Sequence, residues 1–256
     1  INRMLLMTDG GGGGIDPKKV LEETLDRIDN ETAALGWLMD EVDKLLNSKA
    51  AKIFNDVFKI KDEDAFNELR TNAKNLSDSV NKLVTDKGMR DIIKQDLVLI
   101  NYDMSNSDPE KVLKAQAVSF YNGQLVIKTD LILLNNRSFS FGVMYLSKDE
   151  NEIYGDVETV MHEYGHYVQL QELGWAKYIR YIAIPSATSK ERDNYYSQPW
   201  ERTADLFGDV NRVGYRYLPN SEIEAIEYYN NAKDSQSILY DILDGILNKI
   251  IPIQWR

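Results

Sequence analysis

The expected fold follows from one short stretch, His162-Glu163-Tyr164-Gly165-His166, which holds both histidines of the 256-residue chain. On an α-helix, residues four apart project from the same face, separated by about 40° around the axis. Two imidazoles in this arrangement can bind one tetrahedral zinc ion, and the carboxylate that follows the first histidine can reach a water molecule there. The stretch therefore predicts a helix with His162 and His166 as metal ligands and Glu163 as general base. The alternative is a charged, exposed helix without metal.

The residues around this stretch predict a helix over about 157–173. Asp156 is a suitable N-cap and Gly174 a suitable stop. The apolar residues fall on one stripe, roughly opposite the histidines: Val157, Val160, Met161, Tyr164 and Val168. We therefore expect the stripe to face a core and both imidazoles to face an open cleft. Gly165 is a poor helix former, which indicates close passage of a substrate or backbone at the metal face, or close helix packing.

A zinc site with a catalytic role needs a third protein ligand. The chain has no cysteine and no third histidine, so this ligand has to be a carboxylate. We predict Glu201, on a second helix that starts near Pro199 with Ser197 as its N-cap. Three residues share its face, and the small ones allow close helix approach: Ala204, Asp205 and Gly208. Asp205 can accept the second ring N–H of a zinc-bound histidine. The alternative for both carboxylates is an ordinary helix surface.

The two motifs together, His162-Glu163-x-x-His166 and Glu201-x-x-Ala204-Asp205, resemble the gluzincin branch of the zincin metallopeptidases over residues 150–212. The resemblance implies one Zn²⁺ ion held by the two histidines and the glutamate, with the aspartate supporting a histidine from behind. It also implies hydrolysis of peptide bonds in a peptide or protein substrate.

The implied reaction assigns a separate role to each group. Zinc lowers the pKa of water from about 15.7 to about 7, and Glu163 would accept the proton and return it to the leaving amine. Several gluzincins stabilise the tetrahedral intermediate with a further histidine, which this chain lacks, so a tyrosine or an arginine has to replace it. Our candidate is Tyr215, with Tyr217, Tyr195 and Tyr196 as alternatives.

Composition excludes several classes of partner. The formal net charge of −11 argues against nucleic acid or an anionic membrane as the main partner. The absence of cysteine excludes disulfides and thiolate chemistry. No apolar run approaches the roughly 18–20 residues of a membrane span. With 43% hydrophobic residues, the chain can bury a substantial core.

Residues 1–14 end in a run of five glycines after Asp9, which is typical of a linker or junction. Similar junctions precede the C-terminal domains of bacterial secreted proteins of the Rhs/YD repeat type, some of which are zincin toxins. This resemblance implies an extracellular or secreted protein, and a plain tether is the alternative. The chain begins at Ile1 rather than Met, which we expect of a processed form or a cut domain.

The rest of the chain predicts an α+β fold. Residues 15–95 have helical periodicity and form an N-terminal helical lobe, and residues 96–256 form the zincin-like domain. This domain combines a small, mostly antiparallel sheet with the active-site helices. We expect strands at 97–102, 117–121, 125–134 and 138–146, with a hairpin turn at Asn122-Gly123. By the resemblance, the strand at 139–145 pairs with the substrate.

After residue 221 we expect helices that close the domain. The residues expected to lie in their core are Ile223, Ile226, Ile238, Leu239, Ile242 and Leu243.

Three functions are consistent with this sequence. The first is a zinc metallopeptidase. The second is a zinc-containing binding or effector module, similar to a toxin domain, that engages a partner without general proteolysis. The third is a metal-free helical interaction domain. An intact Glu163 and an open fourth position on the metal favour the first, because a purely structural zinc site is normally closed by a fourth protein ligand.

Overall fold

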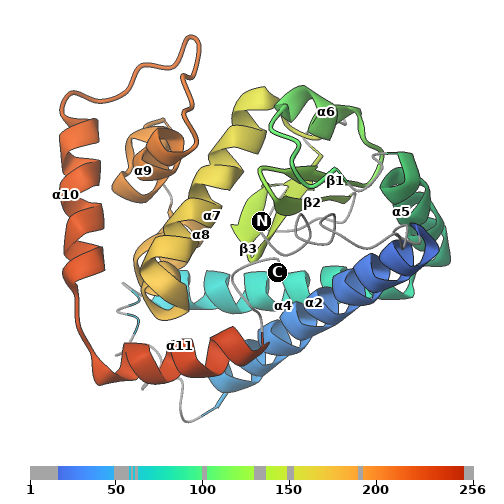
Figure 1. Ribbon diagram of the computed structural model, residues 1–256. Coiled ribbons are helices and arrows are strands. Elements are labelled where there is room, and N and C mark those ends of the chain that lie inside the picture. Colours follow the sequence, from blue (N-terminus) through green and yellow to red (C-terminus); the bar gives the residue numbers. More distant parts are fainter. Residues whose placement is uncertain are drawn as a thin grey trace, which may run out of the picture.

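The computed structural model shows helices packed around one small sheet, an α+β arrangement as predicted (Figure 1). It describes residues 17–48, 58, 60, 63–99, 103–129, 137–148, 153–189 and 193–250. The predicted linker at 1–14 lies outside these residues.

Along the described chain, helices precede and follow the strands of the sheet. The helices are α2 (Pro17–Leu46), α4 (Glu63–Thr85), α5 (Lys87–Leu99), α6 (Pro109–Lys114), α7 (Val157–Tyr178), α8 (Ile184–Thr188), α9 (Pro199–Phe207), α10 (Ser221–Asp234) and α11 (Ile238–Ile250). A π-helical segment, η2 (Ile179–Ala183), joins α7 to α8, and a 3-10 turn, η3 (Tyr195–Ser197), precedes α9. The strands are β1 (Val118–Tyr121), β2 (Gln124–Thr129), β3 (Phe139–Phe141) and β4 (Val143–Ser147).

The sheet is mixed, with strand order β1-β2-β4-β3. The pairs β1–β2 and β3–β4 are antiparallel, and β2–β4 is parallel. The hairpin turn at Asn122-Gly123 is confirmed, and both residues have positive φ, 47° and 81°. The single strand predicted at 138–146 is wrong, because Gly142, with φ 78°, reverses the chain and separates β3 from β4. Only the first half, β3, therefore lies at a sheet edge.

The strand predicted at 97–102 is also wrong where the structure describes it, because 97–99 belong to α5. Ile93 and Leu97 are both buried and lie one helical turn apart, so the apolar run faces the core as a helix. Asp96, buried between them, accepts hydrogen bonds from the backbone N–H groups of Ala117 and Val118. The helix thereby anchors the first strand of the sheet. Residues 100–102 lie outside the described part of the chain.

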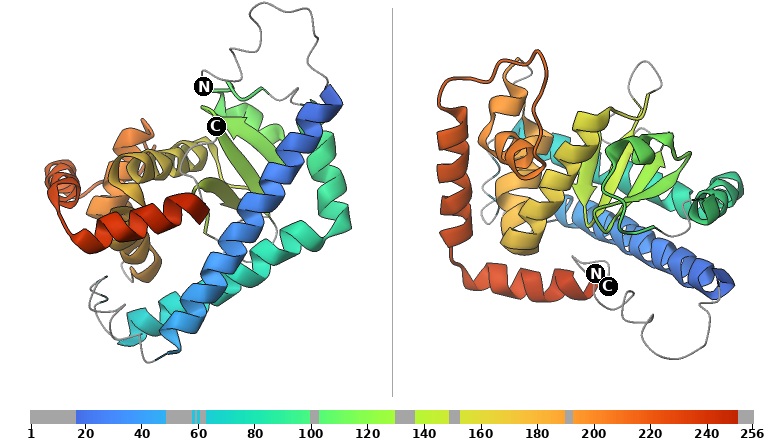
Figure 2. Two further views of the ribbon diagram at one scale, coloured as in Figure 1. Left: turned by 60° about the horizontal axis from the view of Figure 1, so that its bottom comes forward. Right: turned by 45° about the horizontal axis from the view of Figure 1, so that its top comes forward.

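The N-terminal helices are confirmed as helices. In Figure 2, α2 and α4 run side by side, and α5 turns back toward the sheet. Arg90 on α5 forms an ion pair with Asp29 on α2, in which Nη2 lies 2.8 Å from Oδ2. The division of the chain at residue 95 stays a prediction.

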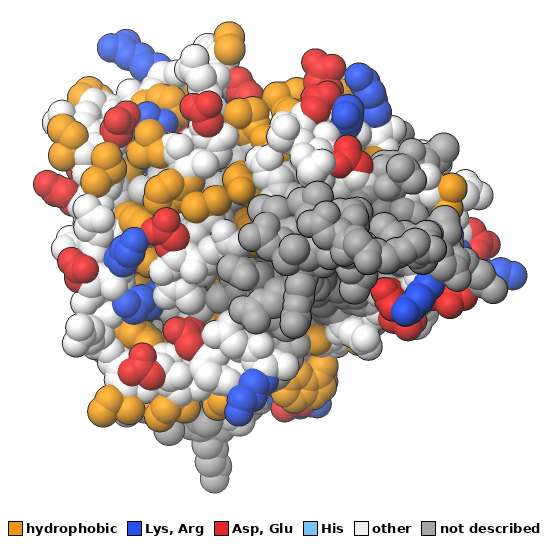
Figure 3. All heavy atoms as spheres, viewed as in Figure 1, with side chains coloured by type: hydrophobic (Ala, Val, Ile, Leu, Met, Phe, Trp, Pro, Cys, Tyr) orange, Lys and Arg blue, Asp and Glu red, His pale blue; other side chains and the backbone are white. Residues whose placement is uncertain are grey.

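The main core lies between the sheet and α7, and α10 and α11 form an outer layer (Figures 1 and 2). The predicted C-terminal core is wrong in most positions, because Ile223, Ile238 and Ile242 are 59%, 79% and 53% exposed. Ile226 and Leu239 are also exposed, and Leu243 is half-buried. Figure 3 shows hydrophobic side chains on the face that these helices present. The two helices bury a different set: Ala225, Tyr229, Ala232, Tyr240 and Leu247.

Candidate metal centre

The helix that carries both histidines begins and breaks at the predicted residues. Asp156 is its N-cap, and its Oδ1 accepts hydrogen bonds from the backbone N–H (2.7 Å) and hydroxyl (2.9 Å) of Thr159. Gly174 interrupts the helical backbone with φ 75°. A second helical segment follows directly, and Asp244 on α11 caps it by accepting from Ala176 N–H at 2.7 Å. The C-terminal helix therefore secures the end of the site helix.

Helix α9 packs against the histidine face of α7 at very close range. A Cβ atom on Gly165 would overlap the carbonyl oxygen of Ala204, and one on Gly208 would overlap that of Met161. Gly165 therefore serves close helix packing rather than the passage of a substrate. Pro199 begins α9 as predicted, but its N-cap is Gln198 rather than Ser197, whose hydroxyl accepts from Leu218 N–H at 2.9 Å.

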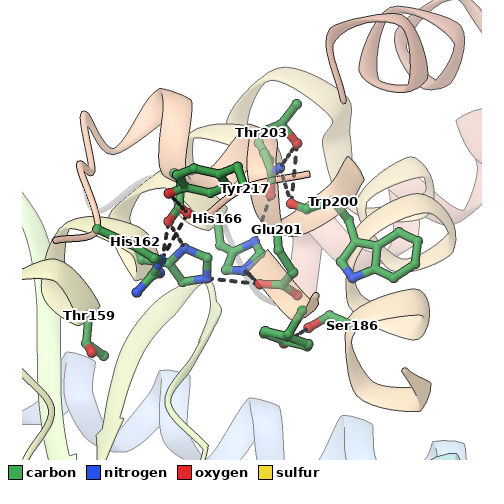
Figure 4. Close-up of polar contacts among 12 residues, drawn as sticks. Thr159, His162, His166, Ser186, Trp200, Glu201, Thr203 and Tyr217 are labelled. Atoms are coloured by element: carbon green, nitrogen blue, oxygen red, sulfur yellow. Dashed lines mark hydrogen bonds and ion pairs between the residues drawn. The ribbon is translucent and has the colours of Figure 1, made fainter. Parts of the chain in front are cut away.

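The close packing brings the three predicted ligands together, although the glutamate is more than thirty residues away in sequence (Figure 4). Glu201 Oε2 lies 3.0 Å from His162 Nε2 and 3.3 Å from His166 Nε2. Ligand atoms of all three residues lie within 4.8 Å of one another. Bonds of 2.0–2.1 Å to a tetrahedral zinc ion separate two ligand atoms by about 3.3 Å. The spacing of the trio thus suits a zinc-sized ion.

Each histidine is oriented from behind by a different side chain. His162 Nδ1 donates to Asp205 Oδ1 at 2.7 Å, as predicted, and His166 Nδ1 donates to Gln169 Oε1 at 2.8 Å. The amide of Gln169 can have only this orientation, because its Nε2 donates to the Trp200 carbonyl at 2.9 Å and to the Thr203 hydroxyl. Gln169 was missed in the sequence, where its spacing of three residues from His166 on one helix was the available signal.

Asp205 is itself held by two residues beyond the end of α9. Arg212 donates to both of its oxygens, with Nε at 3.0 Å from Oδ2 and Nη2 at 2.9 Å from Oδ1. The Tyr217 hydroxyl donates to Oδ2 at 2.8 Å. Tyr217, an alternative candidate for the oxyanion, thus supports the aspartate in this structure. Arg212 was missed, and no local sequence pattern singles it out.

These hydrogen bonds provide a test of whether a metal fits. With a proton on Nδ1 of both rings, the Nε2 lone pairs of His162 and His166 and an oxygen of Glu201 all point at one place. Such convergence is repulsive unless a cation or extra protons lie between the groups. Two buried oxygens, Glu201 Oε1 and Glu163 Oε2, also lack a hydrogen-bond partner. The donor set of two imidazoles and one carboxylate suits Zn²⁺.

The charges of the trio depend on one another. Burial alone would lower the pKa of His162, but the carboxylates of Asp205 and Glu201 raise it to about 9. Burial alone would raise the pKa of Glu201, but the two imidazoles hold it well below its usual range, so this carboxylate is ionised. Burial raises the pKa of Glu163, with the histidines opposing that effect.

The predicted open cleft beside the imidazoles is wrong for this conformation. His162, Glu163 and His166 are 5%, 4% and 6% exposed, and Glu201 is fully buried. In the predicted apolar stripe, by contrast, Val160 alone is buried and the other residues are half-buried. The reason is the docking of α9, which covers the imidazole face.

Four tyrosines lie in or behind the wall of the site. The ring of Tyr196 makes an edge contact with His162 (centroids 5.5 Å apart), and the Arg212 guanidinium lies 3.3 Å from the same ring centroid. Burial and the nearby Glu201 carboxylate raise the pKa of Tyr195 well above its usual value. Tyr215, our candidate, contacts Tyr196 rather than a histidine, and its hydroxyl is buried without a partner. Its catalytic role stays a prediction.

None of the helices described is long and apolar enough to cross a bilayer. Comparison of the chain with protein-family models, curated proteins and solved structures finds no match, so the functional argument depends on the geometry of the metal centre.

Proposed function

We propose that this protein is a zinc-dependent metallopeptidase that hydrolyses peptide bonds in a peptide or protein substrate. The observation that carries the proposal is the convergence of His162, His166 and Glu201 beside the buried, unpartnered carboxylate oxygen of Glu163. The motif resemblance to gluzincins supports the same function.

The number of ligands favours a catalytic site over a structural one. Among the residues that the structure describes, the group able to hold a metal contains three members. Structural zinc sites usually take four protein ligands, whereas catalytic sites take three and leave a position for water or substrate.

In this proposal each side chain has a defined task. The two imidazoles and Glu201 hold the ion, which when bound acidifies water and polarises a carbonyl group. Asp205 and Gln169 keep the protons of the histidines on Nδ1, so that both Nε2 atoms face the ion. Glu163 takes a proton from the attacking water and returns it to the leaving amine, and a pKa raised by burial suits this double task.

The proposal is tested by zinc content and peptide cleavage measured on the same samples. We expect one zinc ion per chain and cleavage of a mixed peptide library that a chelator abolishes. Glu163→Gln should retain the zinc and lose at least about a hundredfold in kcat, the loss typical of a missing general base. Glu172→Gln is the matched control, because Glu172 lies on the same helix and pairs with Lys233 (2.7 Å). Wild-type rates in Glu163→Gln would contradict the proposal.

The burial of the trio favours a second candidate, a zinc-containing effector module that engages a partner without proteolysis. The same experiment separates the two functions. One zinc ion per chain without cleavage of any peptide in the library would favour the second, and protein that binds no zinc would contradict both.

A further inference from the structure

Arg137, two residues before the edge strand β3, is a half-buried cation. Its guanidinium carbon lies 5.4 Å from the ring centroid of Tyr195, in a cation–π contact. Within the described parts of the chain, no carboxylate forms an ion pair with it. Arg90, Arg202 and Arg212, in contrast, each pair with an acidic side chain.

Tyr195 connects this cation to the centre. Its hydroxyl exchanges a hydrogen bond with Ser186 Oγ at 3.0 Å, and it neighbours the carboxylate of Glu201. One tyrosine side chain therefore separates the guanidinium from a candidate metal ligand. The guanidinium lies 5.4 Å from the ring centroid, and half a tyrosine ring with its hydroxyl and one hydrogen bond adds a few ångströms, so the span to the carboxylate is on the order of 10 Å. An extended peptide rises about 3.3–3.6 Å per residue and covers that span with about two or three residues.

We infer that Arg137 binds a carboxylate of the substrate, an inference that rests on the proposed peptidase function. The enzyme then prefers peptides that carry a carboxylate about two or three residues from the cleaved bond. The carboxylate belongs to an acidic side chain or to the C-terminus of the peptide. A guanidinium presents two parallel N–H groups that match a carboxylate, and the cation–π contact with Tyr195 places this guanidinium 5.4 Å from the ring centroid.

Two further properties of the position support this inference. Arg137 is half-buried, so an ion pair there is less screened by water than one on the open surface. The chain as a whole carries a formal net charge of −11, which disfavours acidic peptides, and a local cation without an ion-pair partner offsets that repulsion at this position.

The test compares a reference peptide that lacks the carboxylate with two peptides that each carry it in a different form. The first has Glu at the second or third residue from the cleaved bond and an amidated C-terminus. The second has Gln there and an amidated C-terminus, and the third has Gln and a free C-terminus at the second or third residue from that bond. We expect kcat/KM for the first or the third to exceed that for the second by about tenfold to a hundredfold, the usual effect of a charged hydrogen-bonded pair. The arm that shows the preference identifies the source of the carboxylate.

The variants for this test are Arg137→Gln and Arg137→Lys, with Arg70→Gln as matched control. Arg70, on α4, is also half-buried, and its guanidinium donates to Asn47 Oδ1 at 3.1 Å, away from the centre. Arg137→Gln should reduce the preference to about one, Arg137→Lys should keep part of it, and Arg70→Gln should keep all of it. An unchanged preference in Arg137→Gln would overturn the inference.

Binding provides a readout that does not depend on turnover. In Glu163→Gln protein, fluorescence anisotropy gives Kd for the same three labelled peptides, with and without the change at Arg137. A carboxylate preference that Arg137→Gln removes supports the inference, and equal Kd values for all peptides overturn it. Failure of the proposed function is distinguishable, because it appears as absent cleavage of every peptide by the wild-type enzyme. If Arg137→Gln lowers the melting temperature, the carboxylate preference of Arg137→Lys decides the outcome, because this variant keeps the cation. A partly reduced preference supports the inference, and an unchanged preference overturns it.

Discussion

The two histidines differ in what stands behind them. His162 donates to the carboxylate of Asp205, a charged partner, whereas His166 donates to the neutral amide of Gln169. A carboxylate makes the ring it supports more electron-rich, so we expect His162 to be the stronger ligand and His166 to depend more on orientation alone. In both cases, the partner fixes which nitrogen carries the proton, and that choice decides whether the other nitrogen can bind metal.

Removal of Gln169 should therefore weaken zinc binding without abolishing it. We expect Gln169→Ala to lower zinc affinity about tenfold to a hundredfold, because the His166 ring loses its orientation and its fixed proton. A competition titration against a chromophoric chelator measures this affinity. Gln171→Ala is the matched control, since Gln171 lies two residues away on the same helix and its amide contacts the Tyr167 hydroxyl. Equal affinities for wild-type and Gln169→Ala protein would show that the orienting bond is dispensable.

The candidate metal centre depends on the close packing of α7 against α9. Two glycines, one on α7 and one at the end of α9, each face a backbone carbonyl of the other helix. This contact brings Glu201 to the imidazoles, and the same helix carries Asp205 one turn later. The candidate ligand Glu201 and the supporting Asp205 are thus positioned by a single helix-to-helix contact.

Gly165→Ala should disrupt this contact. In an isolated helix the change stabilises by about 1 kcal/mol, but here the new methyl group overlaps the Ala204 carbonyl. We expect a loss of about 1–3 kcal/mol in the free energy of unfolding and weaker zinc binding, since the helices have to separate. Urea denaturation with chelator present measures the first effect, and the chelator competition measures the second.

Gly245→Ala provides the control for this prediction. Gly245 is an exposed helical residue on α11, and an added Cβ would meet no atom within 4 Å. This variant should be as stable as the wild type or more stable by up to about 1 kcal/mol. A stable Gly165→Ala protein with normal zinc binding would refute the role of the close contact.

At the scale of the whole molecule, the centre links parts of the chain that are distant in sequence. Helix α7 packs on the sheet, α9 is packed between α7 and α10, and α11 caps the second segment of α7 through Asp244 (Figure 1). A metal ion bound by residues of both α7 and α9 stabilises the folded chain only, so its binding adds to the global free energy of unfolding.

Without metal, the stability of the protein should fall as the pH rises from 6.5 to 8. The pKa of His162 is raised from 6.5 to about 9, so its contribution is complete below pH 6.5 and is lost as pH rises through 9. Lys128 acts in the opposite direction above pH 8, because burial lowers its pKa to about 8. His162 therefore accounts for the larger part of the slope between pH 6.5 and 8, and Lys128 reduces that slope toward pH 8. Urea denaturation of chelated protein measures the slope.

A His162→Gln protein tests the assignment of this slope. It lacks the titrating group and should show a smaller decrease in stability between pH 6.5 and 8. The same slope in both proteins would mean that another group is responsible. Addition of zinc to the wild type should raise the stability most at the upper end of the window, where protons compete least with the ion for His162.

The local features of the site could be predicted from the sequence. The helix around His162 and His166, its N-cap and its break at Gly174 depend on neighbours within a few residues, as does the turn at Asn122-Gly123. Helical periodicity also placed Glu201 and Asp205 on one face of the second helix, because a regular helix fixes the direction of each side chain. The α+β class followed from the change in periodicity along the chain.

The remaining features depended on contacts between distant segments. Leu97 lies in a helix rather than a strand because the core and the first strand pack against α5. A short apolar run in the sequence does not distinguish a buried helix from a buried strand. The imidazole face of α7 is buried because α9 docks against it. The isoleucines of α10 and α11 are exposed because none of the described elements covers their face of these two helices. Arg212 reaches Asp205 only through the turn after α9.

The sequence by itself determined which residues can bind a metal, since that follows from their chemistry and helical spacing. Tertiary structure alone decided how close the two helices lie and which side chains stand behind the ligands, because burial depends on what packs against a face.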